Sequence, residues 1–274
     1  MIDSPGSAVG YPSPQGGASL VLAFRLQSNI ILVLGSGPLA ASRAFSALDA
    51  DSKVVILATG GLASACEEVR WRVEHGQLTF VDWDTLPGSS TSSGDDKLVE
   101  ALESYLKDTP EVRLVCMTDT LISGRRNRVF AEKVYRTCRA RNIPINTTDM
   151  PDLCDFTFMS THRFEDASGN ATPLQIGVTT NGQGCRLAGR IRRDIVSRLP
   201  KDVGGAVQRV GRMRVLAKSR EVKEEERYSD EEDEVDELEE NNRVSTPNRP
   251  VPSRSISETE SESSKRRIRW VAQV

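Results

Sequence analysis

Short apolar runs alternate with amphipathic stretches along the first half of the chain. The runs are rich in Val, Ile and Leu, which is typical of strands buried in a sheet. Strands are predicted at 19–26, at 29–37 where the run enters a glycine turn, and at 53–58, 78–83 and 112–118. Helices are predicted between them, at 38–50, 62–73, 95–106 and 126–141. Strands that alternate with helices indicate an α/β fold with a parallel sheet covered on both faces.

The pattern changes after Asp149. Two strands are predicted at 155–164 and 174–182, joined by a polar turn, and they are expected to form a small separate sheet. A basic amphipathic helix is predicted at 185–199, and a further helix begins within 202–219. We therefore expect a second, smaller region that contains both strands and helices.

The two ends of the chain differ in composition from the part between them. Residues 1–18 are rich in Gly, Pro and Ser and are expected to be a flexible lead. Residues 221–265 are acidic, rich in Ser and poor in apolar side chains, so they are expected to be disordered. The last stretch, 266–274, regains apolar character and resembles the first turns of a helix.

The charge is unevenly distributed. The whole chain carries 36 basic and 39 acidic residues, a net charge of −3. Residues 221–240 alone hold 13 acidic and 2 basic residues, a local charge of −11, so the remainder carries about +8. A mildly basic folded part suits an anionic ligand.

The cysteines indicate reducing surroundings. The chain has 5 of them, an odd number, and no CxxC pair. Free thiols in a cytoplasmic compartment are therefore expected. The first residues also lack the basic and apolar regions of a secretory signal peptide.

Composition disfavours several classes of function. The chain has only 2 histidines, so a resident metal site built on His is not expected. No apolar run approaches the roughly 20 residues that a membrane span needs. Aromatic residues make up 5% of the chain, and neither an RNP-type motif nor a helix-turn-helix signature occurs, so no nucleic-acid partner is expected.

A glycine turn links the strand at 29–37 to the next helix. The segment VLGSGPLA places Gly35, Gly37 and Ala40 in a GxGxxA arrangement. Gly35 permits the tight turn, Gly37 lets backbone N–H groups approach a pyrophosphate, and Ala40 allows close packing of helix and strand. The start of a helix also favours negative charge. Dinucleotide binding is the favoured interpretation, and a purely structural turn is the alternative.

The cofactor site is expected at the edge of the sheet where the strands end. An acid after the second strand commonly holds the ribose hydroxyls, but ILATGG offers only Thr59 there, so NAD and NADP stay open. Asp119 could face the cofactor or substrate, or could cap the following helix. The expected cofactor-binding residues are Gly35, Ser36, Gly37, Pro38, Leu39, Ala58, Thr59, Thr118 and Asp119.

Three segments resemble the siroheme synthase family, in order and at suitable spacing: VLGSGPLAASR, NTTDMPDLCDFTF and TTNGQGCRLAGRIRRDI. The most similar members are the fungal bifunctional precorrin-2 dehydrogenases and sirohydrochlorin ferrochelatases, and DMPDLCDF is the most specific part. The resemblance implies a Rossmann-like NAD-binding domain at 19–149 and a small α+β dimerisation region at 150–200. It also implies a helical C-terminal domain that starts at 201–220.

The resemblance implies an activity as well. Family members oxidise precorrin-2 to sirohydrochlorin with NAD as hydride acceptor, and then insert ferrous iron to give siroheme. Iron is in that case a substrate and not a resident metal. The implied partners are the tetrapyrroles and a second copy of the chain in an intertwined homodimer. The key aspartate of the family, in its N-x-x-D segment, falls on Asp149.

The chemistry of Asp149 agrees with that role. A carboxylate near the macrocycle could take the proton released in dehydrogenation and the pyrrole protons released in metal insertion. The alternative is a turn or cap for DMPDL, where Asp152 is the more natural capping residue. Asp155 is expected to be structural, and Cys154 is expected to be a packed small residue and not a nucleophile.

Arginines on the helix at 185–199 could bind the carboxylates of a tetrapyrrole. Arg186 and Arg190 are expected to pair with these groups bidentately, and a solvated helix surface is the alternative. Asn146, three residues before Asp149, could orient the substrate or hold the turn.

The chain departs from the family after Thr180. Family members usually have Ser-Pro where this chain has Gly184 and Cys185, which loosens the expected start of the helix. The acidic insert interrupts the helical domain, and the chain ends about where the second half of that domain is expected. Ferrochelation is therefore less secure than oxidation. A dehydrogenase without chelatase activity and a non-catalytic dinucleotide-binding sensor or scaffold are the alternatives.

Overall fold

The computed structural model describes residues 16–87, 94–120 and 127–225. The chain divides into two compact units, of which the first comprises the residues up to Phe158 together with Thr180–Gly184. The second comprises Met159–Thr179 and the chain from Cys185 onward. Most of the expected flexible lead, and all of the stretch at 266–274, lie outside the described residues.

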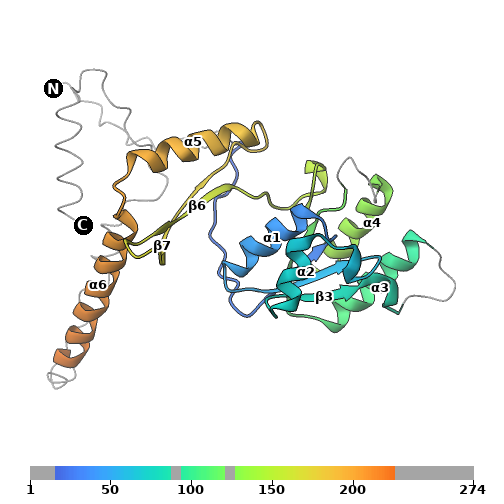
Figure 1. Ribbon diagram of the computed structural model, residues 1–274, viewed down its shortest axis with the longest axis horizontal. Helices are drawn as coiled ribbons and strands as arrows, with labels where there is room; N and C mark the ends of the chain where they lie inside the picture. Colours follow the sequence, from blue (N-terminus) through green and yellow to red (C-terminus); the bar gives the residue numbers. More distant parts are fainter. Residues whose placement is uncertain (1–15, 88–93, 121–126, 226–274) are drawn as a thin grey trace, which may run out of the picture. The chain divides into compact units, whose positions relative to one another are not determined.

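The first unit is built on a parallel sheet of five strands in the order β3-β2-β1-β4-β5. Figure 1 labels the edge strand β3 and the helices α1 to α4 of this unit. The strands are β1 Ile30–Leu34, β2 Lys53–Ala58, β3 Thr79–Asp82, β4 Val112–Met117 and β5 Ile145–Thr147. The chain crosses from one side of β1 to the other between β3 and β4. The boundary between β1 and β4 is therefore the switch point at which sheets of this kind bind ligands.

Helices cover both faces of this sheet. One face carries α1 Pro38–Leu48 and α2 Glu67–Glu74, and the other carries α3 Asp95–Asp108 and α4 Arg128–Arg139. Successive strand residues alternate between the two cores, because side chains of a strand point to opposite faces. Val33 lies in the core with α1 and α2, whereas Leu34 lies in the core with α3 and α4. The predicted α/β, Rossmann-like architecture is confirmed.

The strand predicted at 19–26 is wrong. Residues 16–26 form no regular secondary structure, and Leu20 and Val21 are 79% and 60% exposed. An apolar run becomes a strand only where a neighbouring strand takes up its backbone N–H and C=O groups. This segment is instead held by side chains, since the Ser19 hydroxyl donates to Oδ1 of Asn181 at 2.7 Å.

Three further elements of the first unit differ from the prediction. The short strand β5 was not predicted. The helix predicted at 62–73 is a 3-10 turn at Leu62–Ser64 followed by α2, because the N–H of Cys66 donates to the Ser36 carbonyl at 2.9 Å. The strand predicted at 155–164 starts only at Ser160, because the N–H of Asp155 donates to the Ile145 carbonyl at 2.8 Å. That bond keeps Asp155 beside β5.

The second unit is an antiparallel ribbon with two helices packed on it. The ribbon is β6 Ser160–Glu165 and β7 Ala171–Val178, and the helices are α5 Cys185–Arg198 and α6 Val203–Glu225. The start of α6 approaches the ribbon closely, because a Cβ on Gly204 would lie 2.9 Å from Cβ of Phe164. The predicted disorder from residue 221 begins too early, since α6 continues to Glu225.

Candidate active site

The carboxyl ends of the five strands bring the predicted cofactor residues to one edge of the sheet. Leu34 at the end of β1 is paired with Leu57 of β2 and with Met117 of β4. Met117 is in turn paired with Thr147 of β5, and Leu57 with Val81 of β3. The residues that follow these positions therefore lie along a single edge, from the end of β3 to the end of β5.

The glycine turn has the geometry that the motif predicts. Gly35 has φ +108°, a conformation that L side chains rarely adopt, and its N–H donates to the Leu57 carbonyl at 3.0 Å. A Cβ on Gly35 would also lie 2.7 Å from Oγ1 of Thr118. Ala40 is fully buried between α1 and the sheet. Gly35 and Ala40 therefore serve the tight turn and the close packing expected of them.

The first turn of α1 is open to a ligand. Gly37 is its N-cap residue and has no side chain to accept from the first helical N–H groups. A Cβ on Gly37 would meet no atom within 4 Å, and both Gly37 and Pro38 are exposed. Ser36 is buried, and Leu39 is half-buried. Exposed N–H groups at the start of a helix are suited to a pyrophosphate, so these residues fit the phosphate part of a dinucleotide.

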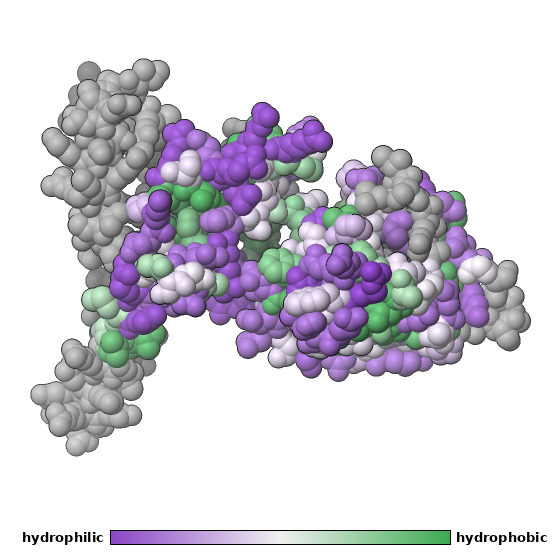
Figure 2. Space-filling view, viewed as in Figure 1, coloured by the Kyte–Doolittle hydropathy of each residue, from purple (hydrophilic) through white to green (hydrophobic). Residues whose placement is uncertain are grey.

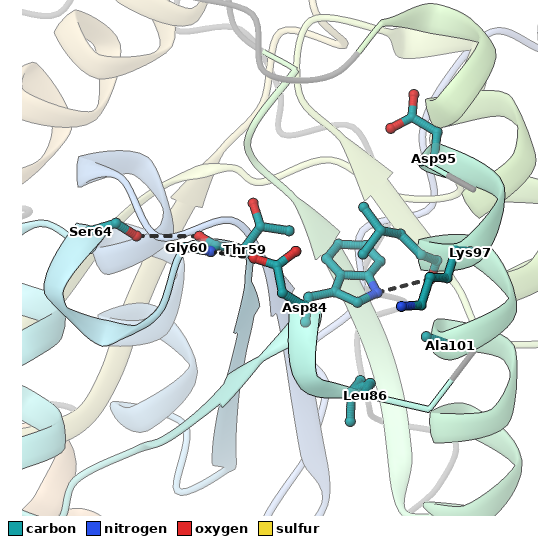
Figure 3. A pocket seen from close by; sticks show the side chains of 11 residues that line it. Thr59, Gly60, Ser64, Asp84, Leu86, Asp95, Lys97 and Ala101 are labelled. Carbon is teal, nitrogen blue, oxygen red and sulfur yellow. Dashed lines mark hydrogen bonds between the residues drawn. The ribbon is translucent and has the colours of Figure 1, made fainter. Parts of the chain in front are cut away.

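A cavity of about 580 Å³ lies beyond the ends of β2 and β3 (Figure 3). Thr59, predicted to contact the cofactor, lines it, and Ala58 is the buried last residue of β2. Asp84 also lines the cavity, and its Oδ2 accepts from the Gly60 N–H at 2.8 Å. Asp84 was not among the predicted residues. Asp84 follows β3, whereas the dinucleotide-binding motif places its acid after the second strand. Only the pairing of β2 with β3 could have indicated that Asp84 lies at this cavity.

The end of β4 supplies Thr118 and Asp119. Thr118 is 5% exposed, and its hydroxyl donates to the Leu34 carbonyl at 2.9 Å, so it ties β4 to β1. Asp119 lies beside the glycine turn, because a Cβ on Gly35 would be 3.1 Å from Cβ of Asp119. Asp119 does not take the alternative role of capping α4. The N-cap of α4 is Asn127, whose side chain accepts from the Phe130 N–H at 2.9 Å.

Asp149 follows β5 at the same edge. Its neighbour Thr148 donates its N–H to the Met117 carbonyl at 3.0 Å, which fixes the segment beside β4. Asp149 itself is exposed and has φ +60°, a region that Asp adopts more readily than most residues. The next turn, Pro151–Leu153, has Met150 as N-cap without a side-chain cap bond. Neither Asp149 nor Asp152 therefore caps this turn, whereas Asp149 does lie in the turn that follows β5, as the alternative interpretation allowed.

The other side chains of this segment are structural. Asp155 accepts from Arg139 at 2.6 Å and from the Ile145 N–H at 3.1 Å, as expected of a structural residue. The Cys154 thiol lies 3.1 Å from both the N–H and the carbonyl of Thr147, and burial raises its pKa, so it is no ready nucleophile. Asn146 is buried and donates to the Phe156 carbonyl at 2.9 Å, which supports its turn-holding role. A substrate contact by Asn146 stays a prediction.

The predicted substrate arginines belong to the second unit. Arg186 and Arg190 are both exposed on α5, whereas Arg192 is half-buried. Helix α5 starts at Cys185 without the Ser-Pro pair of the family, and just before it the Gly184 N–H donates to the Thr180 hydroxyl at 3.1 Å. The helix therefore forms as predicted despite the altered pair.

The part of the chain that the structure describes contains neither a candidate metal cluster nor a candidate membrane helix. No group of three or more His, Cys, Asp or Glu side chains is placed to hold a metal ion there. No helix in the same residues is both long and apolar enough to cross a membrane. Within the described residues all five cysteines are free thiols, as predicted.

Two families match successive parts of the chain. Residues 22–160 match a family described as putative NAD(P)-binding, and residues 172–198 match the central region of sirohaem biosynthesis proteins. Among solved structures, SirC, a precorrin-2 dehydrogenase, is similar with a TM-score of 0.49 and 15% identity, over 72% of this chain and 80% of that one.

Two curated relatives come from Schizosaccharomyces pombe. The siroheme biosynthesis protein met8 is 33% identical over 74% of this chain and 65% of its own length. A probable uroporphyrinogen-III C-methyltransferase is 29% identical over 75% of this chain and 38% of its own length. The chain thus spans less than two thirds of either relative. The two family matches, over residues 22–160 and 172–198, and the 33% identity to met8 show that the chain belongs to the siroheme synthase family.

Proposed function

We propose that this protein oxidises precorrin-2 to sirohydrochlorin with NAD, and that Asp149 is the general base. The observation that carries the proposal is the register of three strands, in which Leu34, Met117 and Thr147 lie side by side. The glycine turn begins directly after Leu34, and Asp149 lies two residues after Thr147. A dinucleotide on the turn and a carboxylate for the substrate would thus share one edge of the sheet.

The described residues fit the proposed cofactor. The uncapped start of α1 offers N–H groups to the pyrophosphate, and the open space at Gly37 lets it approach. The cavity beyond β2 and β3 has room for the adenosine, since ligand pockets are commonly about 300–1,000 Å³. When bound, NAD supplies the nicotinamide ring that accepts a hydride from the substrate.

Asp149 is suited to removing the proton that accompanies the hydride. Its side chain is exposed, and within the described part of the chain no cation forms an ion pair with it. A carboxylate that is already paired with a cation would be a weaker base, because the pair favours the charged form. Loss of one hydride and one proton converts precorrin-2 to the more oxidised sirohydrochlorin, so a single base accounts for the step.

The same carboxylate is proposed to assist insertion of ferrous iron. Two pyrrole N–H protons must leave the macrocycle as the metal enters, and Asp149 could receive them in turn and pass them to solvent. Iron is then a substrate that departs with siroheme. Arg186 and Arg190 are proposed to pair with carboxylates of the tetrapyrrole, since guanidinium groups bind carboxylates bidentately.

The second unit is proposed to form a homodimer. Leu187, Ile191 and Ile195 recur every fourth residue on α5 and are 55%, 39% and 38% exposed. Helix α6 also exposes Met213 and Val215, and Figure 2 shows a hydrophobic patch on the described part of this helix. Among the described residues β6 pairs only with β7. An unpaired strand edge and exposed apolar helix faces are surfaces that a second copy of the chain can cover.

The oxidation is tested by mixing the purified chain with precorrin-2 and NAD and following the appearance of NADH. Asp149→Asn should bind NAD as the native chain does but lose the activity, because Asn tolerates the backbone conformation and cannot accept the proton. Asp152→Asn is the matched control, since it neutralises a nearby exposed carboxylate that pairs with Arg128. Native rates in Asp149→Asn would remove this residue from the mechanism.

Iron insertion needs its own assay, in which sirohydrochlorin and ferrous iron are supplied directly. Siroheme formation by the native chain, lost in Asp149→Asn, is the expected result. Oxidation without insertion would leave a dehydrogenase alone. NAD binding without either reaction would instead indicate a dinucleotide-dependent sensor.

A further inference from the structure

The carboxylate of Asp84 is hydrogen-bonded to the backbone just after β2, although Asp84 itself follows β3. Its Oδ2 accepts from the Gly60 N–H at 2.8 Å, and Gly60 is the second residue after β2 (Figure 3). In nucleotide-binding sheets the end of this strand is where an acid holds the ribose of the adenosine. Residues 58–60, Ala-Thr-Gly, supply no such acid. Asp84 therefore brings a carboxylate to a position that the local sequence leaves without one.

The backbone around Asp84 is held in place from two sides. The Asp84 N–H donates to Oδ1 of Asp82 at 3.1 Å, and this bond caps the short turn Trp83–Thr85. Trp83 is 1% exposed, and its indole N–H donates to the Leu98 carbonyl of α3 at 2.9 Å. The carboxylate is thus preorganised at the cavity wall, so binding a ligand there would require little further ordering.

The cavity beside Asp84 has the chemistry of an adenosine site. Leu86, Leu98 and Ala101 give it an apolar side that suits a purine base, and Thr59, Ser64 and Asp84 give it a polar side. Among the described residues that line it, the charged ones are the carboxylates of Asp84 and Asp95 and the ammonium group of Lys97. A phosphate on the ribose would bring further negative charge against this wall, whereas neutral hydroxyls can donate to it.

We propose that Asp84 binds the 2′ and 3′ hydroxyls of the adenosine ribose and thereby selects NAD over NADP. One carboxylate oxygen keeps its bond to Gly60, and the other is turned to the ribose. The inference rests on the proposed function, because it assumes that a dinucleotide occupies the glycine turn. It settles a choice that Thr59, at the usual position of the acid, leaves open.

Calorimetric titration of the full chain with NAD, NADP, ADP and 2′,5′-ADP tests the proposal without any tetrapyrrole. The native chain should bind NAD and ADP at least tenfold more tightly than the two 2′-phosphorylated nucleotides. In Asp84→Asn this ratio should fall by roughly tenfold or more, because a charged hydrogen bond to the ribose and the repulsion of the phosphate are both lost. Asp108→Asn is the control, since it removes the same charge from an exposed residue at the far end of α3.

The outcomes separate three possibilities. If Asp84→Asn only loosened the loop, the affinities for all four nucleotides would fall alike. The preference for nucleotides without the 2′-phosphate would then be unchanged, which would overturn the role of Asp84. Equal binding of NAD and NADP by the native chain, or tighter binding of NADP, would overturn it without any variant. If the native chain bound none of the nucleotides, the proposed function itself would fail together with this inference.

Discussion

Gly35 lies so close to Thr118 that a Cβ on the glycine would sit 2.7 Å from the threonine hydroxyl oxygen. The contact joins the end of β1 to the end of β4, at the switch point of the sheet. The same hydroxyl donates to the Leu34 carbonyl at 2.9 Å, so it cannot move away without breaking a buried bond. Contacts within the protein therefore constrain the conformation of the glycine turn.

Gly35→Ala should destabilise the first unit. The substitution forces an L residue to φ +108° and drives its methyl group into Thr118, and a strained backbone of this kind costs about 1–3 kcal/mol. Urea unfolding should show a fall in the free energy of unfolding of at least about 2 kcal/mol. A variant as stable as the native chain would mean that the turn relaxes far more easily than its contacts suggest.

Gly37→Ala should behave in the opposite way. Gly37 has φ −82°, and its added Cβ would meet open space, so stability should change by less than about 1 kcal/mol. The methyl group would nevertheless stand where a pyrophosphate approaches the helix. Affinity for NAD, measured by calorimetry, should fall by roughly tenfold or more. Undiminished affinity would show that the cofactor does not lie against the start of α1.

The strands of the parallel sheet could be predicted from sequence because each is a short run of buried Val, Ile and Leu. The run at 19–26 has the same composition, yet it forms no strand. The two segments differ in their strand partners. The strand β1 pairs in register with β2 and β4, whereas Leu20 and Val21 remain largely exposed. Composition predicts that a segment can be buried in a sheet, but not which segment of the chain will pair with it.

The same limit of prediction from sequence applies to Asp84 in the candidate active site. The nucleotide fingerprint relates residues that are close in sequence, so it directs attention to the end of β2 and finds Thr59 there. The bond from Gly60 to Asp84 spans 24 residues and depends on the pairing of β2 with β3. Gly35, Gly37 and Ala40 were predictable because their roles follow from one local turn. The carboxylate of Asp84 at the cavity wall comes instead from the turn that follows the neighbouring strand β3.

Asp155 should be more important for stability than its neighbour Asp152. Asp155 is 16% exposed at its side chain and accepts from both Arg139 and the Ile145 N–H, so Asp155→Ala leaves a buried backbone donor without its acceptor. The expected cost is about 1–3 kcal/mol. Asp152 pairs with Arg128, but both side chains are more than half exposed, so Asp152→Ala should cost clearly less than Asp155→Ala. Thermal unfolding of the two variants compares their losses of stability directly. Equal losses of stability would contradict the structural role of Asp155.

The buried thiols should make the fold sensitive to alkaline pH. Burial raises the pKa of Cys116 and of Cys138 from 9.0 to about 12. The unfolded chain therefore releases these protons at lower pH than the folded chain does. The stability that the protonated thiols contribute is complete below pH 9 and is lost progressively as the pH rises toward 12.

The free energy of unfolding should accordingly decline above about pH 9, and more gently in Cys116→Ala, which removes one of the two groups. Below that pH, iodoacetamide should label the exposed Cys185 long before Cys116 or Cys138. Mass spectrometry of the labelled peptides would identify the order. Early labelling of Cys138 would mean that the face of the sheet under α4 opens readily.

The apolar stripe of α5 is expected to hold two copies of the chain together. Leu187, Ile191 and Ile195 follow the four-residue spacing of one helix face, yet each is more than a third exposed. Full burial of a Leu or Ile side chain contributes about 1.5–3 kcal/mol, so covering the stripe in a second copy would add several such contributions. Ile191→Asp should therefore convert a dimer into a monomer in sedimentation experiments. Ser197→Asp adds the same charge at an exposed position outside the stripe and should stay dimeric. A dimer that survives Ile191→Asp would have to be held together by another surface.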